Sequence, residues 1–208
     1  MDTTDQIRYW SLLPKQTDHT TYRVSEFQSE FFSFVHGASL NYGYVAAEIA
    51  ADTTKWGYQE IRRRRCYWRD KKKLMERIIR TTNISLWQKH KEKLYQKGLW
   101  ADGVCCIIGQ KTVWIGIFGD ASILEVRTDG EQRTMGTINN ESTTARKKLG
   151  QDRYDIDVEI AAFPFELGDA FTFAVGKSAW YSIETLHSYQ EGQEQKKEGD
   201  GLFIIKHI

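Results

Sequence analysis

The side chains that could do chemistry in this sequence are few and scattered. The clearest is His36, which follows the apolar run FFSFV at 31–35 and precedes Gly37 and several small or turn-prone residues. A polar residue that ends a buried strand beside a glycine is a common position for a catalytic group. His36 is therefore a candidate catalytic base, or it stands where a catalytic group once stood.

No established catalytic motif accompanies this histidine. The five histidines of the chain have neither HxxxH nor HExxH spacing, and the sequence contains no GxSxG elbow and no P-loop. Cys105 and Cys106 could supply a thiol nucleophile, but they lie in an apolar run and are expected in the core. Asp120 follows a glycine at a hairpin corner, where aspartate is more often a turn residue than a metal ligand. Local chemistry therefore does not require an enzyme.

Length and composition indicate one folded unit. With 208 residues and 40% hydrophobic residues, the chain is expected to form a single domain over 1–208, with residues 1–20 as an arm or a first strand. No apolar run approaches the roughly 20 residues needed to span a bilayer, and the N-terminus lacks the pattern of a secretory signal. The three cysteines show no ligand spacing and no even disulfide set. We therefore expect a cytoplasmic protein without membrane contact.

The net charge of +1 conceals a basic region. Residues 60–97 contain 14 Lys and Arg against four Asp and Glu, so the rest of the chain is acidic. Such a region can neutralise the phosphates of nucleic acid, but it also fits a solvated helix face, a loop or a surface for an acidic protein. The candidate binding residues are Arg62, Arg63, Arg64, Arg65, Arg69, Lys71, Lys72 and Lys73.

The pattern of apolar residues predicts the elements that position these groups. Two strands are expected within 20–35, a helix over 44–55 and a second helix over about 70–97, where apolar residues recur at three-to-four spacing. Beyond Gly98 the period changes to two, which predicts strands joined by tight turns, a short helix near 179–190 and a last strand. Two long helices and many hairpin-connected strands predict an antiparallel α+β layered fold.

From His36 onward, the order of these elements resembles the PPM family of metal-dependent Ser/Thr protein phosphatases. That family has a strand ending in Asp-Gly, a long helix with an internal Asn, a hairpin with a Gly-Asp corner, a short helix ending in Leu-Gly, and a strand reaching Ser-Asp-Gly. The matching segments are SFVHGASLNYG (33–43), LMERIIRTTNISLWQ (74–88), VWIGIFGDASILEV (113–126), ARKKLG (145–150) and DAFTFAVGKSAW (169–180).

The resemblance implies a four-layer αββα sandwich of two mainly antiparallel sheets flanked by helices. This sequence departs from the family in having a shorter flap region, between Arg127 and Tyr154. The resemblance also implies a binuclear Mg²⁺ or Mn²⁺ site at one end, where clustered aspartates and metals activate a water to attack a phosphoserine or phosphothreonine. Hard divalent cations take anionic oxygen ligands, and closely packed carboxylates are tolerable when the metals lie between them.

Two positions of that implied site have lost their carboxylates. His36, with Gly37, stands for the metal-bridging Asp-Gly pair, and Val175, with Gly176, stands for the Asp-Gly of Ser-Asp-Gly. An imidazole is a poor substitute for a carboxylate that bridges two hard ions, and valine offers no ligand. These four residues are therefore expected to be degenerate, non-catalytic positions.

Three residues are the remnant metal candidates. Asp120 keeps the Gly-Asp corner, Asp200 of EGDG resembles the family's terminal aspartate, and His36 keeps a nitrogen ligand. Asp102-Gly103 is another Asp-Gly pair, but we set it aside because the resemblance places a small-residue turn there.

Three hypotheses follow. The leading one is a catalytically degenerate phosphatase-like domain, a pseudophosphatase, which needs no cofactor and regulates a protein partner such as a phosphoprotein or kinase. The second is an active metal-dependent Ser/Thr phosphatase with an altered site that uses Mg²⁺ or Mn²⁺. The third is an assembly subunit that docks through the basic region at 60–97 onto RNA or an acidic protein.

Overall fold

The computed structural model describes residues 7–12, 21–39, 41–63, 70–95, 98–137, 146–191 and 201–208. Ten strands of these ranges form two five-stranded sheets in which every neighbouring pair is antiparallel. The β6–β9 sheet has the order β1 (Ile7–Leu12), β10 (Leu202–His207), β9 (Ala170–Val175), β6 (Ala121–Val126), β7 (Gln132–Gly136). The β3–β4 sheet has the order β2 (Tyr22–Phe27), β3 (Phe31–Gly37), β4 (Ala101–Ile108), β5 (Thr112–Phe118), β8 (Val158–Pro164).

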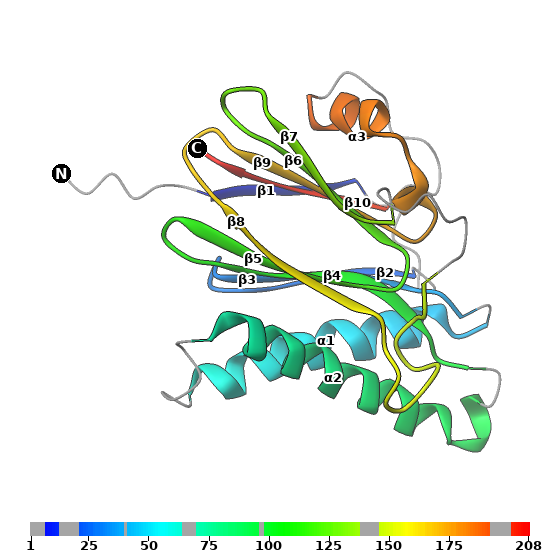
Figure 1. Cartoon of the computed structure of the whole chain (residues 1–208). Coiled ribbons are helices and arrows are strands. Elements are labelled where there is room, and N and C mark those ends of the chain that lie inside the picture. Colours follow the sequence, from blue (N-terminus) through cyan, green and yellow to red (C-terminus); the bar gives the residue numbers. More distant parts are fainter. Residues whose placement is uncertain are drawn as a thin grey trace.

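The sheets stack face to face, and helices cover the outer faces (Figure 1). Helices α1 (Gly43–Arg62) and α2 (Lys71–His90) pack on the β3–β4 sheet, and α3 (Ile183–Gln190) packs on the β6–β9 sheet. Two short 3₁₀ turns, η2 (Lys93–Tyr95) and η4 (Gly176–Trp180), complete the described elements. This arrangement confirms the predicted αββα sandwich.

The central strands are apolar on both faces because each sheet lies between two layers. In β3, Phe32 and Phe34 belong to the core between the sheets, whereas Phe31 and Val35 belong to the core under α1 and α2. A strand buried on both faces reads as a continuous apolar run rather than an alternating one. The prediction of a buried strand at FFSFV is therefore confirmed.

The helix boundaries differ from those predicted. The helix expected over 44–55 continues to Arg62, and the helix expected over 70–97 ends at His90. The side chain of Asp70 accepts a hydrogen bond from the Lys73 N–H at 3.0 Å, which caps the start of α2. At the N-terminal end of the chain, residues 7–12 form a first strand paired with β10. Within the described ranges, no helix has both the length and the apolar character needed to cross a membrane.

Candidate functional site

One end of the sandwich brings together polar side chains from several strand ends. His36, near the end of β3, lies directly opposite Asp102, near the start of β4. Both side chains lie on the face that carries Phe34 and Val104, so they are directed into the space between the sheets. His36 Nδ1 and Asp102 Oδ2 are 3.4 Å apart, and the Asp102 side chain is fully buried.

The tight corner between β5 and β6 adds Asp120 to this end. The hairpin predicted at Gly119-Asp120 was wrong, because the chain passes here from the β3–β4 sheet to the β6–β9 sheet. Gly119 has φ of 64°, in the left-handed region, and a Cβ at this position would collide with Asp102 Oδ1. Only glycine fits there without strain. The corner therefore comes close enough for the Asp120 N–H to donate to Asp102 Oδ1 at 3.0 Å.

Lys148 closes the group. Its Nζ lies 2.8 and 3.0 Å from the two carboxylate oxygens of Asp102 and 2.6 Å from Asp120 Oδ2. Burial disfavours a charged ammonium, but the attraction and hydrogen bonds of the two carboxylates outweigh it and raise the pKa of Lys148. Lys148 is therefore protonated at neutral pH. We call His36, Asp102, Asp120 and Lys148 the Lys148 cluster.

The segment that carries Lys148 is held by contacts to two other elements. Leu149 and Ala101 exchange two backbone hydrogen bonds, at 3.1 and 3.0 Å. From α2, Asn83 accepts a hydrogen bond from the Gly150 N–H at 2.8 Å and donates to the carbonyl oxygens of Asp152 and Arg153 at 2.8 and 3.0 Å. The internal asparagine of α2 thus fixes the loop from which Lys148 reaches the two carboxylates.

The end of β9 lies at the same place. Val175 is fully buried in the core between the sheets. Gly176, with φ of 62°, donates its N–H to the Asp120 carbonyl oxygen at 2.8 Å, and a Cβ on it would lie 2.6 Å from His36 Nδ1. The structure therefore brings His36, Gly37, Asp120, Val175 and Gly176 to one end, whereas Asp200 lies outside the described residues.

As far as the structure describes the chain, the groups at this end do not fit a pair of divalent cations. Both oxygens of Asp102 and one of Asp120 already bond to the Lys148 ammonium, and the other Asp120 oxygen accepts the Arg146 N–H at 3.3 Å. The side chain of Val175 has no atom that could act as a ligand. Among the residues that the structure describes, no group of three or more His, Cys, Asp and Glu side chains is placed to hold a metal ion.

Sequence reasoning missed two members of the cluster. The small-residue turn expected at Asp102 was wrong, because Asp102 lies inside β4 and pairs with His36. The charge of Asp102 at the start of an otherwise apolar strand could have indicated this, since a buried carboxylate needs a partner. For Lys148 the sequence holds no comparable indication.

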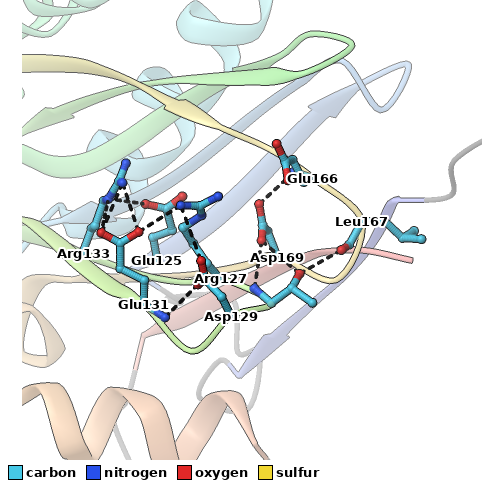
Figure 2. A network of polar contacts seen from close by, with 9 residues as sticks. Glu125, Arg127, Asp129, Glu131, Arg133, Glu166, Leu167 and Asp169 are labelled. Atoms are coloured by element: carbon cyan, nitrogen blue, oxygen red, sulfur yellow. Dashed lines mark hydrogen bonds and ion pairs between the residues drawn. The ribbon is translucent and has the colours of Figure 1, made fainter.

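A second polar group, drawn in Figure 2, lies at the other end of the β6–β9 sheet. Glu125 of β6 is fully buried, and Arg133 Nε is 4.0 Å from its Oε2. Neither carboxylate oxygen of Glu125 has a hydrogen-bond partner among the described residues. Burial raises the pKa of Glu125 to about 7. We call Glu125, Arg127, Glu131, Arg133 and Asp169 the Glu125 cluster.

The other members of the Glu125 cluster make several hydrogen bonds and ion pairs, although Arg127 Nε has no hydrogen-bond partner among the described residues. Asp169 accepts hydrogen bonds from the N–H groups of Thr128 and Glu166, at 3.1 and 2.8 Å. Glu131 Oε2 lies 2.9 Å from Arg127 Nη1 and 3.1 Å from Arg133 Nη2. These contacts tie the β6–β7 and β8–β9 turns together, so the cluster has a structural role.

The basic region at 60–97 is described in part. Arg62, Arg63 and Lys73 make ion pairs with Glu30, Glu60 and Asp70 at 3.2, 2.8 and 3.3 Å. The pairs of Arg63 and Lys73 are exposed, and exposed pairs are weak. Arg62 is partly buried and also contacts Gln28 and the ring of Phe27. Arg64, Arg65 and Arg69 lie outside the described residues, and binding by this region stays a prediction that also involves Lys71 and Lys72.

Neither of the two cysteines in the described ranges supplies a nucleophile at this site. Cys105 and Cys106 are free thiols buried in the two cores, as predicted. Burial raises the pKa of both thiols, which disfavours the reactive thiolate.

Comparison with known proteins identifies the fold. No family model and no curated protein sequence matches the chain. The catalytic domain of the Ser/Thr protein phosphatase PstP, solved with two manganese ions, superposes with a TM-score of 0.71 at 13% identity, covering 96% of both chains. The PPM Ser-Thr phosphatase MsPP from Mycobacterium smegmatis, solved with cacodylate, gives 0.70 at 10% identity, covering 96% of both chains. Stp1 from Staphylococcus aureus gives 0.66 at 14% identity, covering 99% of this chain and 96% of that chain.

The chain therefore has the fold of the PPM Ser/Thr phosphatases over nearly its whole length, which confirms the resemblance noted from the sequence. Identities of 10–14% establish the fold alone.

Proposed function

We propose that this chain is a catalytically degenerate phosphatase-like domain that acts as a binding and regulatory module. The proposal rests on one observation. His36 and Val175 occupy the two positions that the resemblance assigns to metal-binding carboxylates, at one end of the sandwich, and Val175 is fully buried.

The physical reason is the charge that the metal-dependent reaction requires. Two dications have to be held by several carboxylates, and they then lower the pKa of the attacking water and neutralise the phosphoryl oxygens. Replacing two carboxylates by an imidazole and an isopropyl group removes two negative charges from the ligand set. Asp120 remains, but it is engaged by Lys148 and by the Arg146 N–H.

The retained scaffold supports a role in binding. Apolar side chains fill the core between the sheets and the core under α1 and α2. Backbone and side-chain hydrogen bonds hold the end of the sandwich around Lys148. A fold kept without the ligand set of its reaction can still present surfaces to other molecules. We expect a protein partner, such as a phosphoprotein or kinase.

A phosphatase assay tests the proposal. The purified chain is incubated with p-nitrophenyl phosphate and with a phosphothreonine peptide, in Mn²⁺ and separately in Mg²⁺. We expect no turnover above that of the matched Asp120→Asn variant. Turnover that Asp120→Asn or His36→Ala abolishes, while circular dichroism shows both variants folded, would establish an active phosphatase with an altered metal site instead.

A salt titration separates this role from docking onto RNA. An assembly subunit that binds RNA through the basic region should lose affinity steeply as salt rises, because phosphate neutralisation releases counterions. We expect the affinity for a phosphothreonine peptide to exceed that for single-stranded RNA at physiological ionic strength. The reverse order, with weaker RNA binding by a Lys71→Ala/Lys72→Ala variant, would favour the assembly role.

A further inference from the structure

The Lys148 ammonium lies where a cation would bind the two aspartates. Its distances to three carboxylate oxygens, 2.6 to 3.0 Å, are those of charge-assisted hydrogen bonds and are longer than the roughly 2.0–2.1 Å of magnesium–oxygen bonds. The three oxygens come from two strand ends, those of β4 and of the β5–β6 corner. A single positive charge therefore bridges the two carboxylates as a metal ion would.

This position is built into the fold. The Lys148 side chain is only 18% exposed, and the Lys148 N–H donates to Gln151 Oε1 at 2.9 Å. Asn83 and the Leu149–Ala101 pair hold the same segment from two further directions. Neighbouring Lys147 has a different environment, because it is half exposed and pairs with exposed Asp155. The two adjacent lysines thus differ in burial and in partner.

The charges explain why a cation is needed. Asp102 is fully buried and Asp120 nearly so, and two carboxylates in contact with the same atom would repel each other without a positive charge between them. Metals fulfil this need where a site binds them. Here one ammonium and the N–H groups of Asp120 and Arg146 supply the donors.

We propose that Lys148 is a covalently attached replacement for the divalent cations of this fold. It keeps Asp102 and Asp120 together, makes the folded domain independent of Mg²⁺ and Mn²⁺, and excludes those ions from the site. This inference deepens the proposed function and rests on it, since it states how the degenerate site is stabilised.

Manganese binding to a set of matched variants tests this inference. Isothermal titration with Mn²⁺ and thermal unfolding with Mn²⁺ or EDTA are applied to the parent chain, Lys148→Ala, Lys148→Met, Lys148→Arg and Lys147→Ala. Lys148→Ala leaves space beside the two carboxylates, whereas Lys148→Met fills it without charge. Lys148→Arg keeps the charge, and Lys147→Ala removes the neighbouring charge only.

For the parent chain, Lys148→Arg and Lys147→Ala, we expect no saturable Mn²⁺ binding. The Tm of each should be the same in Mn²⁺ as in EDTA. Lys148→Ala and Lys148→Met should unfold about 10 °C lower, because they leave buried carboxylates unpaired. Only the Tm of Lys148→Ala should rise again when Mn²⁺ is added. The rise should be about 5 °C or more when the Mn²⁺ concentration is well above the dissociation constant of this variant for Mn²⁺. Lys148→Ala/Asp120→Asn should lose that recovery.

Saturable Mn²⁺ binding by the parent chain that Asp120→Asn abolishes would overturn the inference, even if Lys148→Ala does not fold. An unchanged Tm in Lys148→Met would also overturn it, because the ammonium would then contribute nothing. Neither measurement depends on turnover. A parent chain that binds Mn²⁺ without hydrolysing phosphoesters refutes this inference alone, whereas hydrolysis refutes the proposed function.

Discussion

The two ends of the β6–β9 sheet both contain buried carboxylates, but the hydrogen-bond partners of these carboxylates differ. Asp120 precedes β6 and Glu125 lies five residues further along it, a separation of about 16 Å in an extended strand. At one end, Asp102 and Asp120 have an ammonium and backbone N–H groups as donors. At the other end, Glu125 is equally buried but neither of its oxygens has a hydrogen-bond partner among the described residues.

The difference shows that donors, rather than depth, decide how a buried carboxylate behaves. Lys148 touches its partners at hydrogen-bond distance, whereas Arg133 Nε remains 4.0 Å from Glu125 while its guanidinium bonds to Glu131. An attraction at that distance does not replace the lost hydration of the carboxylate. Burial therefore raises the pKa of Glu125 to about 7.

The largest expected effect is at Asp102. Asp102→Asn removes a fully buried charge and leaves Lys148 with Asp120 alone, so the free energy of unfolding should fall by about 3–5 kcal/mol. Urea unfolding at pH 7 measures it. The matched control is Asp155→Asn, which breaks the exposed pair with Lys147 and should cost less than about 1 kcal/mol. If Asp102→Asn and Asp155→Asn lost the same free energy of unfolding, the ion pairs of Lys148 and Lys147 would contribute equally to stability.

A pH titration of stability should reveal the second effect, at Glu125. Between its ordinary pKa of 4.5 and its folded pKa of about 7, the unfolded chain has lost this proton and the folded chain keeps it. Glu125 therefore makes the folded state less stable as pH rises through that window, by about 3 kcal/mol in total. Compared with Glu125→Gln, the parent chain should lose that amount between pH 4.5 and pH 7.

Glu131 of the same cluster provides the opposite control. Hydrogen bonds from Arg127 and Arg133 lower the pKa of Glu131, so its contribution to stability is present above pH 4.5 and is lost as pH falls. Replacing Glu131 by Gln should thus change the pH profile with the opposite sign from Glu125→Gln. Profiles of the same sign would contradict the contrast drawn between these two glutamates.

The smallest expected difference, about 2 kcal/mol, is between two glycines with positive φ, Gly119 before β6 and Gly130 in the β6–β7 turn. Gly119 has a φ of 64° and Gly130 a φ of 86°. An alanine Cβ at 119 would collide with Asp102 Oδ1, whereas at 130 it would meet nothing within 4 Å. Gly130→Ala should cost about 1–2 kcal/mol from backbone strain alone, and Gly119→Ala should cost about 2 kcal/mol more. Similar losses by thermal unfolding would remove the special role of the Gly119 corner.

The sequence predicted the layered fold well because its main features are local or periodic. The run FFSFV indicated a buried strand, and the order of segments indicated the αββα sandwich. The change of period after Gly98 indicated hairpins, which the structure has at β4–β5 and β6–β7 but not at β5–β6. The prediction of where the helices end was less accurate. Alanines at 46, 47, 50 and 51 let α1 pack close to the sheet, and its actual end at Arg62 depends on contacts with α2.

The site was predictable only in part because its contacts are far apart in the sequence. Positions 36, 120 and 175 could be placed from strand order. The pairing of His36 with Asp102 spans 66 residues and that of Lys148 with Asp102 spans 46. No local pattern records such pairings, and the reach of a flexible lysine depends on loop contacts, here those of Asn83. The Lys148 cluster therefore became visible only in three dimensions.

The backbone at Gly37 has a consequence for protein engineering. Its N–H donates to the Thr21 carbonyl oxygen at 2.7 Å, the next N–H donates to Trp100, and a Cβ at Gly37 would collide with the carbonyl of Gly43, where α1 begins. These main-chain contacts do not involve the side chain at position 36. A substitution at position 36 can therefore change the chemistry of this strand end while the contacts of the Gly37 backbone remain.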